Sequence, residues 1–136
     1  MAKLIQDLWI LTESGIALFS RLQDDTLNEQ LFAMLMSALN SFAEEITSGG
    51  LSNFELSNKR FTIVNRNEFI FVASSNPKTK EKKAISELEV IIEKFFNKYG
   101  DYLKDWDNEI SIFKGFETDI DDSLENTIKK FQKAFW

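Results

Sequence analysis

The chain has 136 residues, which suits one domain spanning residues 1–136 with a single buried core. It contains no cysteine and no histidine, which excludes disulfides, thiolate metal sites and the commonest general base and metal ligand. Because these side chains are absent, we expect a protein with no cofactor and no enzyme activity. The formal net charge of −6 disfavours binding to nucleic acid or to an anionic membrane surface.

The N-terminal segment predicts a β-hairpin. The run Leu8–Leu11 is apolar throughout, as in a strand buried on both faces. Thr12–Gly15 is polar and ends in glycine, which suits a tight reversal. Residues 16–22 then resume as a second strand.

A long helix follows the hairpin. Thr26 and Glu29 match a capping box, and the helical pattern continues to Ile46, just before a pair of glycines. At 100° per residue, the predicted inward face consists of Leu31, Leu35, Ala38, Leu39, Phe42 and Ile46. The predicted solvent face consists of Gln30, Ser37, Asn40, Ser41 and Glu44.

The apolar arc of this helix spans about 160°, wider than the ~100° that a surface helix needs. Phe32, Met36 and Ala43 extend the arc on one side. One sheet face is too narrow to cover them all, so we expect flanking residues such as Phe32 and Met36 to remain exposed.

Three further strands and two helices complete the pattern. The strands are predicted around Phe54–Leu56, at Phe61–Val64 and at Phe69–Ala73, the last of which is central because it is apolar throughout. A second helix opens at Asn76-Pro77 and ends at Gly100.

The C-terminal part is less regular. Residues 101–115 are compatible with either an extended segment or a prolonged helix. Thr118 and Asp121 resemble a capping box for a third helix, which would lie outside the core because its apolar seam is narrow. The seam consists of Ile120, Leu124, Ile128, Phe131 and Phe135.

The order of these elements, from the hairpin Leu8–Phe19 through the strands of 48–73 to two helices, resembles that of longin domains, and most of all small stand-alone archaeal ones. The resemblance implies an α+β (α/β) fold. Its five-stranded antiparallel sheet has the order 2-1-5-4-3, with one helix on one face and two on the other. It also implies a dimerising platform in small-GTPase regulation or membrane-traffic-like assembly (vesicle trafficking), whose partner is another copy, a longin- or roadblock-type protein, or a small GTPase.

Five residues form the predicted protein-binding surface. They are the helix flank Phe32, Met36 and Ala43, together with Phe54 and Leu56 of the strand that the longin order places at the sheet edge. An exposed edge strand beside an apolar helix flank is a place where another chain can pair. The alternative is that other parts of the chain cover these residues.

Other functions would each need a feature that the sequence does not clearly supply. A small-ligand sensor of profilin- or PAS-like architecture would enclose a pocket of several hundred Å3 lined by Phe and Trp. A carboxylate hydrolase would need two acids in one cleft, whereas the acids at 105–109 and 117–122 suit a loop and a helix start. Asp105–Glu109 resembles the start of a calcium loop, but Ile110 replaces the required glycine.

Two remaining features concern location and charge. No apolar run approaches the ~20 residues needed to cross a bilayer, so we expect a cytoplasmic protein without a transmembrane segment. The four lysines within Lys78–Lys83 suit a solvated helix start, with a docking patch for an acidic partner as the alternative.

Overall fold

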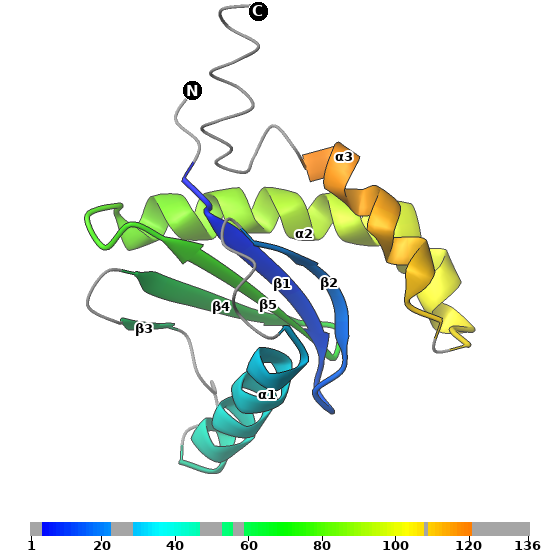
Figure 1. The fold of residues 1–136 in the computed structure, drawn as a ribbon, viewed down its shortest axis with the longest axis horizontal. Coiled ribbons are helices and arrows are strands. Elements are labelled where there is room, and N and C mark those ends of the chain that lie inside the picture. The colour runs from blue at the N-terminus through cyan, green and yellow to red at the C-terminus, as the bar shows by residue number, and fades with distance from the viewer. Residues whose placement is uncertain (1–3, 23–28, 47–52, 56–58, 108, 121–136) are drawn as a thin grey trace, which may run out of the picture.

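The protein has a computed structural model, which describes residues 4–22, 29–46, 53–55, 59–107 and 109–120. Its strands form a curved sheet with helices on both sides (Figure 1). Five strands were predicted, and the sheet contains five antiparallel strands in the order β2-β1-β5-β4-β3. Their bounds are β1 (Asp7–Thr12), β2 (Ala17–Arg21), β3 (Asn53–Glu55), β4 (Arg60–Arg66) and β5 (Phe69–Ser75).

The two apolar runs of the sequence are neighbours in the middle of the sheet. β1 pairs with β5 in a register that places Trp9 opposite Val72 and Thr12 opposite Phe69. Both strands are buried along nearly their whole length. Burial on both faces explains why neither strand alternates between apolar and polar residues.

The predicted reversal between β1 and β2 is confirmed. Gly15 has φ = +97°, its amide donates to the Thr12 carbonyl at 3.0 Å, and the Thr12 amide donates to the Ile16 carbonyl at 2.9 Å. A positive φ favours glycine because a Cβ would crowd the backbone.

One sheet face is covered by helix α2 (Glu81–Lys104), a 3-10 turn η1 (Ser111–Gly115) and the short helix α3 (Phe116–Ile120). The core here is rich in aromatic rings, with Phe95 at its centre. The Phe95 ring centroid lies 5.6 Å from that of Phe71, 5.7 Å from Phe113 and 5.5 Å from Phe116. The contacts with Phe71 and Phe116 are edge-to-face, a geometry that adds to the stabilisation from burial.

Helix α1 (Glu29–Ile46) covers the opposite face. Its Phe32 ring stacks on Trp9 with centroids 4.0 Å apart, and Phe61 packs beside both rings. The layers are therefore an antiparallel sheet with one helix on one side and two on the other, as the resemblance to longin domains implies.

Two predicted bounds of the second helix are wrong. Asn76-Pro77 forms a turn, with the Lys78 amide donating to Asn76 Oδ1 at 2.9 Å, and α2 begins only at Glu81. At the other end α2 passes through Gly100 and stops at Lys104. A helical glycine costs only about 0.5–1 kcal/mol, which is outweighed because the following turns pack onto the core.

For residues 101–115 the alternative of a prolonged helix is confirmed only as far as Lys104, and the described residues after it form neither a strand nor an α-helix before Phe116. The chain turns back into η1, and α3 begins at Phe116 rather than near Thr118. The Thr118 hydroxyl donates to the Gly115 carbonyl at 2.7 Å, so it lies within the helix instead of capping it. Ile120 is buried in the core, and the rest of the predicted third-helix seam lies outside the described residues.

Candidate interaction site

The outer side of α1 is the most unusual surface of the described structure. Six large apolar side chains are exposed there. They are Leu31, Met34, Leu35, Leu39, Phe42 and Ile46, with relative exposures of 64, 55, 54, 38, 63 and 71%. At 100° per residue they span an arc of about 140°, which forms a continuous apolar stripe along the helix.

Polar residues hold the inner side of α1 against the sheet. Ser37 Oγ donates to the Glu13 carbonyl, and Gln30 Nε2 donates to the Gly15 carbonyl at 2.6 Å. Asn65 Nδ2 donates to Asn40 Oδ1 at 3.1 Å. These hydrogen bonds attach α1 to the ends of both hairpins. The inner side of the helix therefore carries the polar Ser37 and Asn40 beside buried apolar residues, and the larger apolar stripe faces solvent.

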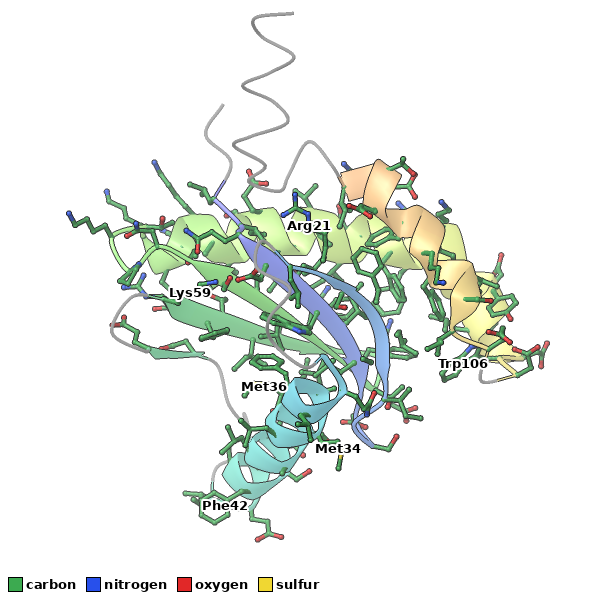
Figure 2. All side chains as sticks on the ribbon, in the orientation of Figure 1. Arg21, Met34, Met36, Phe42, Lys59 and Trp106 are labelled. Carbon is green, nitrogen blue, oxygen red and sulfur yellow. The ribbon has the colours of Figure 1, made fainter. Side chains whose placement is uncertain are left out.

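The predicted orientation of α1 is therefore wrong. Phe32 and Met36, expected to be exposed, are 9% and 2% exposed, because they fill the space above Trp9. Ala43 is half-buried. The expected inward face is the outer one, as the outward side chains of Met34 and Phe42 in Figure 2 illustrate.

The predicted edge strand is present. β3 pairs with β4 and ends the sheet, and Phe54 lies in its centre opposite Phe61. Leu56 lies outside the described residues. Contacts from Gln30 to Ala17 in β2 and from Asn40 to Asn65 in β4 show that α1 crosses the sheet in the direction of the β3 edge.

The acidic residues after α2 have structural partners. Asp107 Oδ1 accepts hydrogen bonds from the Glu109 amide at 3.1 Å and from the Tyr102 hydroxyl at 2.9 Å. The backbone hydrogen bond from Glu109 and then the Tyr102 hydroxyl hold the pKa of Asp107 below its ordinary value. Within the described residues no group of three acids is placed to hold a metal ion.

The acids near α3 also have a structural role. Asp119 Oδ2 lies 2.5 Å from Lys98 Nζ, and this hydrogen bond raises the pKa of the lysine. The pair ties α3 to α2. Lys78, Lys80, Lys82 and Lys83 all have exposed side chains around the start of α2, as a solvated helix start requires, and the alternative of an acidic partner stays a prediction.

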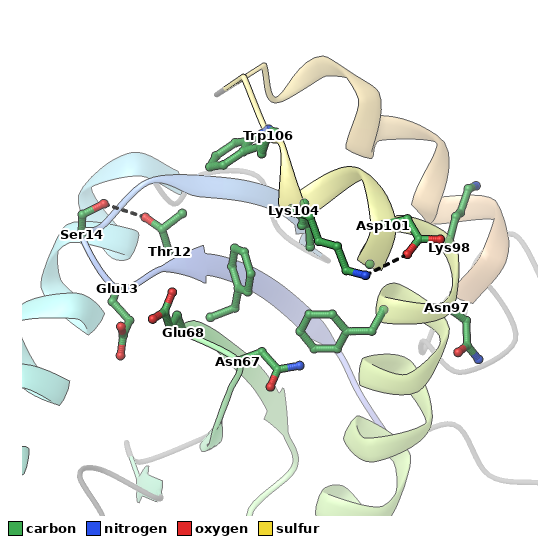
Figure 3. Close-up of a pocket in the computed structure, with 14 residues that line it drawn as sticks. Thr12, Glu13, Ser14, Asn67, Glu68, Asn97, Lys98, Asp101, Lys104 and Trp106 are labelled. Carbon is green, nitrogen blue, oxygen red and sulfur yellow. Dashed lines mark hydrogen bonds and ion pairs between the residues drawn. The ribbon is translucent and has the colours of Figure 1, made fainter.

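A groove lies where α2 passes the tips of both hairpins, a feature that the sequence patterns did not predict. It has a volume of about 880 Å3, and its walls come from the β1–β2 turn, the β4–β5 turn and the last turns of α2 (Figure 3). Apolar and charged side chains both line it. The apolar ones are Phe69, Phe96, Leu103 and Trp106, and the charged ones are Glu13, Glu68, Lys98, Asp101 and Lys104.

None of the described helices is long and apolar enough to cross a membrane.

Comparisons with known proteins agree with the layers of the fold. Residues 6–113 match the family described as the first longin domain of FUZ, MON1 and HPS1. No curated protein matches the sequence.

Solved structures show the same fold at low sequence identity. MglB from Myxococcus xanthus aligns with a TM-score of 0.53 and 14% identity, covering 69% of this chain and 78% of its own. A roadblock/LC7 domain from Streptomyces avermitilis aligns with a TM-score of 0.54 and 14% identity, covering 74% of this chain and 87% of its own. The gliding protein MglB from Thermus thermophilus aligns with a TM-score of 0.54 and 6% identity, covering 63% of this chain and 74% of its own.

Proposed function

The chain belongs to the family of the first longin domain of FUZ, MON1 and HPS1, and from this premise we propose that it is a non-enzymatic module that pairs with a second longin- or roadblock-type domain through the outer face of α1. The second domain is another copy of this chain or a related protein. The role that follows from the family is a platform in small-GTPase regulation or membrane-traffic-like assembly in the cytoplasm.

The observation that supports pairing is the direction in which α1 faces. A surface helix ordinarily buries its apolar stripe and exposes its polar residues. Here Ser37 and Asn40 face the sheet while Leu35 and Phe42 face solvent. Contiguous exposed apolar patches of this kind mark protein interfaces in soluble proteins.

The magnitudes favour association. Burying one Leu, Ile or Phe side chain stabilises by about 1.5–3 kcal/mol relative to leaving it in water. An isologous pair buries the same six residues twice, once from each copy. That gain is of the same order as or larger than the roughly 4–15 kcal/mol that association costs in lost freedom of motion.

The test combines light scattering with two aspartate substitutions. We expect wild-type protein to have twice its monomer mass of 15.8 kDa, and Leu35→Asp and Phe42→Asp each to shift it to the monomer. Val90→Asp is the matched control, because Val90 is 44% exposed on α2, away from the α1 stripe. A monomer at high concentration that neither substitution affects would contradict self-pairing.

Pairing with a different longin-type chain needs a second measurement. A photo-crosslinking amino acid at position 35, compared with one at position 90, reports what covers α1 in native extract. Cross-linking at position 35 to a longin- or roadblock-type chain supports the proposal. If both self-pairing and this selective cross-link are absent, the proposed interface is wrong.

A further inference from the structure

The groove between α2 and the two hairpin tips has the composition of a binding site for a cationic, partly apolar ligand. Its volume of about 880 Å3 falls within the range of roughly 300–1,000 Å3 typical of ligand sites. It is open to solvent, so it can receive an extended chain. We propose that this groove binds a linear peptide segment of a partner protein in which a lysine or arginine stands beside apolar side chains.

The apolar wall is rigid. Phe69 and Phe96 are half-buried with ring centroids 6.1 Å apart, and both line the groove. Trp106 Nε1 donates to the Glu109 carbonyl at 3.0 Å, and its ring packs on Phe113. A ring fixed in this way loses little conformational entropy when an apolar side chain covers it.

Two carboxylates give the groove its charge preference. The sheet register pairs Thr12 with Phe69, so the adjacent residues Glu13 and Glu68 lie on neighbouring turns. Figure 3 shows both carboxylates on the same side of the groove, opposite Lys104. Both side chains are exposed, and neither has an ion-pair partner among the described residues.

The lysines of the groove do not cancel these charges. Lys98 Nζ is 2.5 Å from Asp119, and Lys104 Nζ is 3.5 Å from Asp101. The last turn of α2 also points its free carbonyl groups toward this end of the helix, which favours a cation. A peptide lysine or arginine placed between the two glutamates therefore gains two attractive contacts while its apolar neighbours cover the rings.

The backbone at Glu68 supports a role for its carboxylate. Asn67 and Glu68 have φ of +52° and +70°, the conformation of a turn in which glycine is favoured at the second position. A glutamate held there is strained and makes no ion pair within the described structure.

The test uses synthetic peptides and the NMR shifts of backbone amides and tryptophan indole groups of the full chain. The probe is an eight-residue peptide of alternating lysine and leucine, with two reference peptides in which glutamate replaces lysine or serine replaces leucine. We expect only the lysine–leucine peptide to bind tightly, with shift changes at Glu13, Glu68 and the Trp106 indole. The double variant that combines Glu13→Gln and Glu68→Gly is expected to bind the lysine–leucine peptide roughly tenfold or more weakly than wild type.

Matched controls separate the groove from general attraction to an acidic protein. Glu93→Gln, an exposed carboxylate on α2 outside the groove, should leave the affinity unchanged. Leu35→Asp should leave it unchanged as well, so a failure of pairing through α1 and a failure of this proposal are distinguishable. Glu68→Gly should also raise thermal stability, because glycine suits the positive φ, and this shows that weaker binding is not due to unfolding.

Three results would overturn the proposal. The first is equal binding of the lysine–leucine peptide to wild type and to the double variant. The second is a set of shift changes that lies away from the groove. The third is binding of the lysine–serine peptide or of free spermine as tight as that of the lysine–leucine peptide, because a small polycation would then be the occupant.

Discussion

The two faces of the sheet bury apolar side chains in opposite ways. On the α2 face, the helix turns its apolar side inward, and Phe95 is surrounded by other rings. On the α1 face, Phe32 and Met36 reach the sheet, but six other large apolar residues of the helix stay in water. The first face is a fully covered core, whereas the second leaves an apolar stripe exposed on α1, and it is on this stripe that we propose a partner binds.

The largest expected effect compares the stability contribution of a buried residue on the α2 face with that of an exposed residue of α1. Phe95→Ala should lower the free energy of unfolding by about 3–5 kcal/mol, because it leaves a cavity in a fully buried cluster. Leu35→Ala should change it by about 0.5 kcal/mol or less at low protein concentration. Urea unfolding measures both changes. A similar decrease in the free energy of unfolding for the two variants would contradict the difference between the two faces.

The next effect compares two glycines, one in the β1–β2 turn next to α1 and one within α2. Gly15→Ala should destabilise by about 1–2 kcal/mol, because its φ of +97° is unfavourable for any residue with a Cβ. Gly100→Ala should stabilise by about 0.5–1 kcal/mol, because it lies within α2 and no atom stands within 4 Å of the new Cβ. Opposite shifts in melting temperature are the expected result, and equal signs would contradict it.

A smaller effect tests the polar attachment of α1. Ser37→Ala removes the hydrogen bond to the Glu13 carbonyl and should cost about 0.5–1.5 kcal/mol. Ser41→Ala, on the exposed side of the same helix, is the control. Hydrogen exchange should show faster opening of α1 in the first variant while the α2 amides are unchanged. Unchanged α1 exchange would show that this bond does not hold the helix.

The smallest effect concerns pH and the segment after α2. Hydrogen bonds lower the pKa of Asp107 in the folded protein, so the ionised carboxylate adds to the free energy of unfolding. This stabilisation is fully present above the ordinary carboxyl pKa of about 4 and is lost as pH falls through the lower pKa of the folded protein. Asp107→Asn should therefore narrow the difference between the urea midpoints at neutral pH and at pH 3. Asp105→Asn controls for the change in net charge, and an equal response of both variants would argue against this role.

Element order was predictable because it depends on local patterns. The runs in β1 and β5, and the reversal at Gly15, follow from burial on two faces and from a positive φ. The end of α2 was not predictable, since the cost of Gly100 is small beside the packing of the turns that follow it.

The rotation of α1 was missed for a different reason. Periodicity shows which residues share a face but not which face meets the sheet, and the larger apolar face was assigned inward. The decisive groups were the hairpin carbonyls that Ser37 and Gln30 satisfy, which are distant in sequence. The groove was missed because Glu13, Glu68 and Trp106 come together only through the register of β1 and β5 and the length of α2.

The exposed stripe of α1 also has a consequence for the abundance of the protein in its cell. Helices with uncovered leucine and phenylalanine are recognised by chaperones and proteases, and newly made chains meet these before they meet a partner. Copies made in excess of the partner should therefore be degraded faster than paired ones. The amount of this protein would then follow the supply of whatever covers α1, without any dedicated regulator of its synthesis.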